Sequence, residues 1–429
     1  MFLLLLSGLW IGFSLLATGV IGMLLHDLHL PPTLSIWDKI GGLIANSIWN
    51  SVNSWSLTAL PLFIFMGEIL YRTAISTKLL NGLVPWLTRI PGRLLHINVL
   101  ACSLFAAVSG SSAATTATVG KITLDELSRR GYDRHLALGS LAGAGTLGFL
   151  IPPSLIMIIY GILSDTSIGK LFIGGVIPGL LLAGLYSVFI VFRAVTDSKV
   201  VPEMEERFTF RERVAAFKEL APVLLLILAV LGGIYLGFTT PTEAAGIGVV
   251  GSFVLAVAFR NLTRTNFQEA VISAVKTTAM ICFIIIGAAF LSQVVGFVGI
   301  ARALSTYIVG LDLSPYLLIL VVGLMYLFLG MILDGISIVV MTLPIVLPIV
   351  VKSGFDPLWF GIFLVFMVEL SQITPPVGFS IFVIQGISDE TVGNILRATF
   401  PFFLIMILMV VLVTVFPEIV FYLPRKMVE

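Results

Sequence analysis

The sequence predicts an all-α polytopic membrane protein made of two inverted-topology repeats, each with a re-entrant helical hairpin and a broken transmembrane helix. Three observations support this fold class: the composition, a duplicated Pro-Pro motif, and two apolar stretches with polar centres. Of the 429 residues, 58% are hydrophobic and only 11% are charged, and the mean hydropathy is +1.11. Soluble domains carry about 25% charged residues, so most of this chain is expected to lie in a bilayer.

Two stretches of the chain contain the same sequence motif. Pro152-Pro153 and Pro375-Pro376 each interrupt a long apolar segment, 223 residues apart, and small polar turns follow them at 164–169 and 388–393. Proline lacks an amide N–H and clashes with the preceding turn, so each pair predicts a break in a transmembrane helix. Duplicated broken helices are typical of secondary transporters, whose binding sites lie at the repeat interface.

Apolar runs place the remaining spans. A span needs about 20 apolar residues, and such runs occur at 2–25, 48–71, 136–163, 171–192, 220–238, 241–259, 277–298, 358–384 and 399–422. Two further stretches, 94–128 and 317–350, have the length of two short helices but carry small polar residues at their centres. We expect both to be re-entrant hairpins, because irregular backbone survives in a membrane only where protein or water covers it.

The distribution of Lys and Arg tests this topology. With a cytoplasmic N-terminus and two re-entrant hairpins, 18 of the 24 Lys and Arg fall on the cytoplasmic side and six on the other. Making either hairpin a full span would invert everything after it and weaken this bias. The first hairpin is therefore expected to open to the cytoplasm and the second to the outside, where the C-terminus also lies.

The repeats divide the chain into three parts. These are a first repeat (1–192, with hairpin 94–128 and broken helix 136–163), a cytoplasmic linker with a connecting helix (193–240), and a second repeat (241–429, with hairpin 317–350 and broken helix 358–384). Amphipathic arms in the membrane plane are expected at 36–40 and 266–271. The linker is too small for a catalytic domain.

The predicted binding site lies where each hairpin tip meets its broken helix. Free carbonyls and hydroxyls there can replace the hydration shell of Na⁺, and half-helix N-termini can hold a carboxylate. The candidates in the first half are Ser109, Gly110, Ser111, Ser112, Thr115, Thr116, Gly145, Thr146, Gly148, Pro152 and Pro153. Those in the second half are Gly330, Asp334, Gly335, Ser337, Gln372, Thr374, Pro375, Pro376 and Gly378.

Several of these residues have a structural interpretation as well. Small and hydroxyl residues in membrane helices also serve close helix packing. Asp334 either faces a cavity or an ion, as intramembrane acids often do, or caps the half-helix that follows it. Glu243 and Glu369 are each expected either to cap a helix or to hold the fold.

Other function classes lack their signatures. The chain has no Gly-rich phosphate loop, so ATP is not the expected fuel. Its four histidines do not have the spacing of metal ligands. It also lacks the paired acids or the Ser–His pair that would indicate an enzyme. A net charge of +1 argues against a nucleic-acid partner. A passive channel would not need two symmetric broken-helix sites.

Four motifs, at 109–118, 240–246, 329–337 and 373–378, together resemble the large membrane (M) subunit of tripartite ATP-independent periplasmic (TRAP) transporters. The resemblance covers essentially the whole chain. It implies an elevator-type fold like that of the ion transporter superfamily, in which the hairpins and broken helices move against a static scaffold. It also implies Na⁺ at the contacts between hairpin tips and broken helices as the coupling ion, with no resident cofactor.

The resemblance further implies import of an organic acid, such as a C4-dicarboxylate, sialic acid or another sugar acid, across the bacterial inner membrane. A periplasmic substrate-binding protein would deliver it. Because the first repeat begins near residue 2, the small four-helix (Q-type) membrane subunit is expected to be a separate chain. The alternative is a stand-alone sodium/carboxylate symporter that needs no binding protein.

Overall fold

The computed structural model describes residues 1–429 except 26–34, 74, 198, 203–207, 260–261, 301–302, 305, 307–313, 376–377 and 428–429, and every statement below concerns the described residues. The elements of the first half are α1 (Phe2–Leu6), α2 (Ile11–Leu25), α3 (Ile36–Val52), η1 (Trp55–Thr58), α4 (Ala59–Tyr71), α5 (Ile75–Leu87), η2 (Arg93–Leu95), α6 (His96–Ser109), α7 (Ser112–Arg129), α8 (Arg134–Gly145), α9 (Leu147–Leu150), α10 (Leu155–Ser164) and α11 (Ile168–Thr196).

The remaining elements are also helical. They are α12 (Phe210–Tyr235), α13 (Pro241–Ala258), α14 (Arg264–Val298), α16 (Pro315–Gly330), α17 (Gly335–Lys352), α18 (Pro357–Gln372), α19 (Phe379–Ile387), α20 (Val392–Val415), α21 (Glu418–Phe421) and η3 (Pro424–Lys426). Seven helical segments are long and apolar enough to cross a membrane, or eight if the pair α3 and η1–α4, bent by 57°, counts as one span. The chain is thus an all-helical, multi-pass membrane protein.

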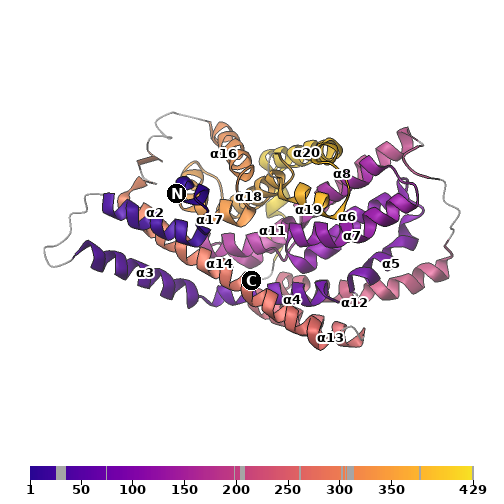
Figure 1. Ribbon diagram of the computed structural model, residues 1–429, viewed down its shortest axis with the longest axis horizontal. Helices are drawn as coiled ribbons and strands as arrows, with labels where there is room; N and C mark the ends of the chain where they lie inside the picture. The colour runs from indigo at the N-terminus through magenta and orange to yellow at the C-terminus, as the bar shows by residue number, and fades with distance from the viewer. Residues whose placement is uncertain are drawn as a thin grey trace.

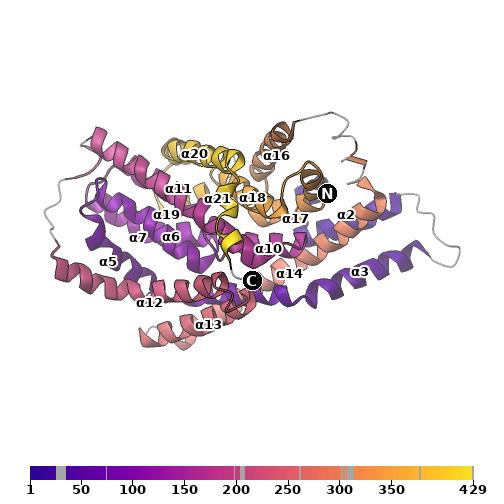
Figure 2. The same cartoon turned by 180° about the vertical axis from the view of Figure 1, so that it is seen from behind.

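The helices form two layers. In Figures 1 and 2, α3, α4, α12 and α13 follow one long side of the molecule, and α14 runs diagonally across them. Helices α16, α18 and α20 follow the opposite side. The pairs α6–α7 and α16–α17 lie toward opposite ends of the long axis, so the second layer contains both helix pairs and the interrupted helices between them.

Both predicted hairpins are pairs of helices broken at their polar centres. The first breaks at Gly110, whose φ of 59° is in the left-handed region that glycine adopts without strain. Ser111 then caps the second helix of the pair. In the second pair, residues 331–334 separate α16 from α17, and Asp334 is the N-cap of α17.

Both Pro-Pro segments interrupt a helix, as predicted. α8 and the short α9 end before Pro152-Pro153, which is a cis bond, and α10 begins at Leu155. In the second half α18 ends at Gln372 and α19 begins at Phe379. Lone prolines such as Pro178, in α11, do not end their helices, because neighbouring helices and local adjustments satisfy the freed carbonyl.

Five elements differ from the sequence prediction. Segment 264–298 is one continuous 35-residue helix rather than an arm and a separate span, because no proline or Asn-Ser pair interrupts it. In the first half the predicted span 48–71 is interrupted at Asn53-Ser54, where polar side chains favour caps over helix interior, and residues 48–52 belong to α3. Helix α5 was not predicted, span 2–25 is divided between α1 and α2, and the last span ends at Val415, before Pro417.

Helices of the two halves pack reciprocally. The second helix of the first hairpin, α7, packs on α19, and the second helix of the other hairpin, α17, packs on α10. Likewise α8 packs on α20 and α18 on α11, while α2 packs on α14 and α13 on α4. Each interrupted helix is therefore enclosed by elements from both halves.

Candidate functional site at the hairpin tips

The first hairpin tip is a dense cluster of hydroxyl groups. The Ser109 and Thr115 hydroxyl oxygens lie 2.9 Å apart, and the Ser111 hydroxyl accepts a hydrogen bond from Ala114 N at 3.5 Å. Ser112 and Thr116, one turn apart on α7, are fully buried. The Thr116 hydroxyl has no hydrogen-bond partner within the described structure.

Glycines let this tip lie directly on the first broken helix. Leu155 N donates to the Gly110 carbonyl at 3.3 Å, and a Cβ added at Gly110 would lie 2.7 Å from the Pro153 carbonyl oxygen. A Cβ at Gly148 would collide with the backbone of Ser112. One at Gly145 would collide with the Thr116 hydroxyl. The first tip and its broken helix therefore meet through backbone contacts.

Glu369 joins this contact from the other half of the chain. It lies on α18 and is fully buried. Its Oε1 accepts hydrogen bonds from the Ser112 hydroxyl and from Phe149 N, the latter at 2.8 Å. Of the two possibilities that the sequence left open, Glu369 holds the fold, whereas Glu243 caps α13 in a capping box with Thr240.

The second hairpin tip is organised by its own acid. The Asp334 side chain accepts hydrogen bonds from Ile336 N at 3.1 Å and Ser337 N at 3.3 Å, and from the Ser337 hydroxyl. Asp334 is exposed and Ser337 is buried. The acid thus caps the half-helix α17.

This second tip contacts both broken helices. A Cβ at Gly335 would lie 2.5 Å from Val368 Cγ1 and 3.3 Å from the Gln372 side-chain nitrogen, both on α18, and 3.1 Å from Ile156 Cδ1 on α10. A Cβ at Gly330 would collide with the side chain of Ser371. Gly378, with φ of 29°, has Thr374 O 3.0 Å from the position of a Cβ.

The sequence predicts both tips and both breaks, but Glu369 is not among its candidate site residues. Of the remaining candidates, Thr146 bonds to the Gly143 carbonyl within its own helix, Pro152 lies in the first break, and Pro375 in the second. Pro376 lies outside the described residues. The sequence does show Glu369 as an acid within an apolar run, four residues before Ile373. Nothing in the sequence, however, specifies its partners in the first half.

The chemistry of the described site is that of oxygen ligands. Carbonyl and hydroxyl oxygens at both tips suit a hard monovalent cation. Among the described residues no group of three His, Cys, Asp or Glu side chains could hold a metal ion.

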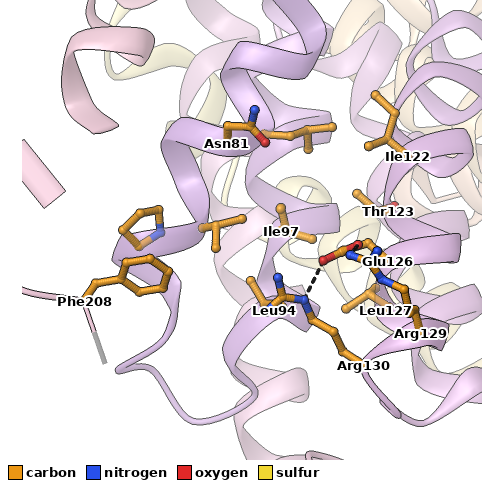
Figure 3. A pocket seen from close by; sticks show the side chains of 13 residues that line it. Asn81, Leu94, Ile97, Ile122, Thr123, Glu126, Leu127, Arg129, Arg130 and Phe208 are labelled. Carbon is orange, nitrogen blue, oxygen red and sulfur yellow. Dashed lines mark hydrogen bonds and ion pairs between the residues drawn. The ribbon is translucent and has the colours of Figure 1, made fainter. Parts of the chain in front are cut away.

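Three cavities lie at the boundary between the two layers. One of about 380 Å³ separates α5 from the base of the first hairpin, where Glu126 pairs with Arg129 and, at 2.6 Å, with Arg130 (Figure 3). The other two, of about 360 and 300 Å³, share Ser54, Ile162 and Asp165.

A charged link joins the halves outside the spans. Arg134, at the start of α8, pairs with Glu390 at 3.3 Å, and the Asn394 amide donates to the same carboxylate at 3.1 Å. The Asn394 hydrogen bond and then the Arg134 guanidinium hold the pKa of Glu390 below its usual 4.5.

Helical hairpins seated on interrupted helices within a multi-pass membrane fold define a membrane transport protein of the broken-helix class. Residues 1–419 match the family model of the tripartite ATP-independent periplasmic transporter, DctM component. The chain belongs to this family and is a large membrane subunit of a TRAP transporter.

Relatives from several bacteria resemble the chain over most of its length. It is 36% identical to the C4-dicarboxylate TRAP transporter large permease protein DctM of Pseudomonas aeruginosa, with 89% of each chain covered. It is 28% identical to the sialic acid TRAP transporter large permease protein SiaM of Vibrio cholerae, covering 98% of this chain and 96% of that one. It is 31% identical to the isethionate TRAP transporter permease protein DctMQ of Oleidesulfovibrio alaskensis, of which it covers 59%.

A solved structure shares the fold. The YdaH transporter of Alcanivorax borkumensis superposes with a TM-score of 0.66 over 95% of this chain and 97% of that one, at 15% sequence identity. This likeness concerns the fold alone.

Proposed function

We propose that this chain is the translocating subunit of a sodium-driven importer for an organic acid, located in the inner membrane of a bacterium. Na⁺ binds where each hairpin tip meets its broken helix, and the acid binds between the two tips. The two halves form inverted-topology repeats, and the layer that holds the hairpins moves as an elevator against the other.

The observation that carries this proposal is that each tip touches both broken helices. The first tip lies on Gly148 and Pro153 and bonds to Glu369, and the second lies on Gln372 and Ile156. Both tips therefore converge on one region, where the ends of several half-helices and their free backbone groups come together. Ion binding at one tip can alter the substrate position at the other, which is the coupling that symport requires.

The layered architecture supports the elevator mechanism. The three cavities at the layer boundary leave room for sliding, and the hairpins and broken helices pack on one another as a single group. The reciprocal contacts of α7 with α19 and of α17 with α10 are those that an inverted repeat would produce.

Family membership supports the partners. A tripartite transporter needs a substrate-binding protein and a small membrane subunit in addition to this one. We propose that both are separate chains that assemble with this subunit. The substrates named for relatives, C4-dicarboxylate, sialic acid and isethionate, are all organic acids.

The test is uptake into proteoliposomes that contain this chain and its small subunit, with loaded binding protein outside and with or without an inward sodium gradient. Uptake that needs both sodium and the binding protein is the expected result. Sodium-driven uptake of free substrate without the binding protein would instead make the protein a stand-alone symporter. Uptake indifferent to sodium would overturn the proposed coupling ion.

A further inference from the structure

The two hairpin tips are stabilised in different ways. Aligning Gly110 with Gly335 places Ser109 opposite Asp334 and Ser112 opposite Ser337. The second tip therefore carries its own acid, whose side chain bonds to Ser337, whereas the first tip has a serine at that position. The N-cap of α7 is the Ser111 hydroxyl, which accepts from Ala114 N at 3.5 Å, the outer limit of a hydrogen bond.

Glu369 supplies the missing acid from another helix. Its Oε1 accepts a hydrogen bond from the Ser112 hydroxyl in the first turn of α7. In the same way, Asp334 accepts a hydrogen bond from the Ser337 hydroxyl in the first turn of α17. An acidic group at a helix N-terminus is favourable because the free amides carry partial positive charge. The same oxygen also accepts a hydrogen bond from Phe149 N, so this one atom connects the first hairpin tip, the first broken helix and α18.

The burial of Glu369 argues against a passive role. The residue is fully buried, and its second oxygen, Oε2, has no hydrogen-bond partner in the described structure. A buried carboxyl group with an unsatisfied oxygen is costly.

We propose that Glu369 is a positioning residue that holds the first hairpin tip on its broken helix and thereby sets the sodium affinity of the first-half site. The proposal rests on the proposed function. Glu369 acts through Ser112 and Phe149 and is not itself a ligand, so the geometry of its acceptor oxygen matters more than its charge.

The experiment measures the sodium concentration that gives half-maximal uptake by the reconstituted complex. Glu369→Ala is expected to raise it at least tenfold, with uptake at saturating sodium within about threefold of the parent. Glu369→Gln keeps an acceptor oxygen. Its half-maximal sodium concentration and its uptake at saturating sodium are both expected to stay within about threefold of the parent. Combining Ser112→Ala with Glu369→Ala should add little, because the two changes remove the same hydrogen bond.

Tyr326→Phe is the matched control. It removes the buried hydrogen bond between Tyr326 and Thr342, at 2.9 Å, which joins the two helices of the second hairpin and does not involve the first tip, and it is expected to leave the sodium requirement unchanged. An unchanged sodium requirement in Glu369→Ala, or a Gln variant as impaired as the Ala variant, would overturn the positioning role.

A second readout remains usable if the Ala variant inserts poorly. In this experiment Ala113 is replaced by cysteine, and Cys102 and Cys282 are replaced by alanine. The rate at which a maleimide labels the new cysteine, in the complex without substrate, measures how accessible the first tip is. Sodium should slow labelling in the Gln variant, and the Ser112→Ala variant should need several-fold more sodium for the same effect. Identical sodium dependence with and without Ser112→Ala would refute the proposal, whereas sodium-independent uptake by the parent would refute only the proposed function.

Discussion

At the scale of single residues, Gly148 shows how closely the first broken helix approaches the hairpin tip. A Cβ there would collide with the backbone of Ser112, which cannot move aside as a flexible side chain could. We expect Gly148→Ala to destabilise the protein by about 1–3 kcal/mol, as overpacking does, and to abolish uptake by separating the tip from α9. Thermal unfolding and proteoliposome uptake measure the two effects.

Gly184→Ala is the control for that prediction. Gly184 lies in α11 with no heavy atom within 4 Å of an added Cβ, so alanine is expected to be neutral or to gain up to about 1 kcal/mol of helix propensity. Equal behaviour of the two variants would show that the close approach at Gly148 is dispensable.

Asp334 gives a second residue-scale prediction. Because its side chain caps α17, Asp334→Asn should retain stability and uptake, and Asp334→Ala should lower stability by about 1 kcal/mol and impair uptake. Unfolding temperature and uptake are measured together. Lost uptake in a stable Asn variant would instead identify the carboxylate as an ion ligand.

Residue types could be predicted at the tips because they follow from local rules. Glycine at the break and serine or acid before a half-helix are caps that a short window of sequence shows. The contact of Glu369 with Ser112 could not be predicted, since the two residues are 257 positions apart and no local pattern specifies the pairing.

At the scale of helices, the Pro-Pro pairs were better guides than single prolines. Pro344 and Pro348 both lie inside α17, and Pro222 lies inside α12, without ending the helix. The amphipathic arms in the membrane plane were harder to predict. An arm joined to a span has the same apolar periodicity as one continuous helix such as α14. Only a local breaker such as Asn53-Ser54 distinguishes the two.

The link between α8 and the turn before α20 predicts a pH dependence. Because the folded-state pKa of Glu390 is lowered, its contribution to stability is full above its usual 4.5 and disappears as the pH falls through the lowered value. We expect the unfolding temperature of the parent to fall more than that of Glu390→Gln between pH 6 and pH 3. Parallel curves would contradict a native role for the ion pair.

At the scale of the whole molecule, the charge bias predicts the orientation in the membrane. In a background without Cys102 and Cys282, Lys352→Cys should react with an impermeant maleimide in intact cells. Lys199→Cys should react only after the membrane is permeabilised. Both lysine positions are exposed. The opposite pattern would invert the topology.

The charge count predicts sides of a membrane but not the arrangement within it. The described helices break near the Pro-Pro pairs and at Gly110 and Asp334, as the sequence predicts, yet nothing in the sequence showed that the helices divide into two layers. Packing between distant helices decides this arrangement, and hydrophobic residues of lipid-facing and protein-facing surfaces look alike in sequence.

The contact between Glu369 and the first hairpin also bears on how the protein is made. A ribosome adds roughly 5–20 residues per second, so Ser112 emerges on the order of tens of seconds before the acid that it will bond. During that interval the first hairpin is already in or near the translocon with its tip incomplete. Biogenesis of this subunit therefore includes a waiting period, in which an insertase or chaperone that shields the nascent first half would raise the yield of correctly assembled protein.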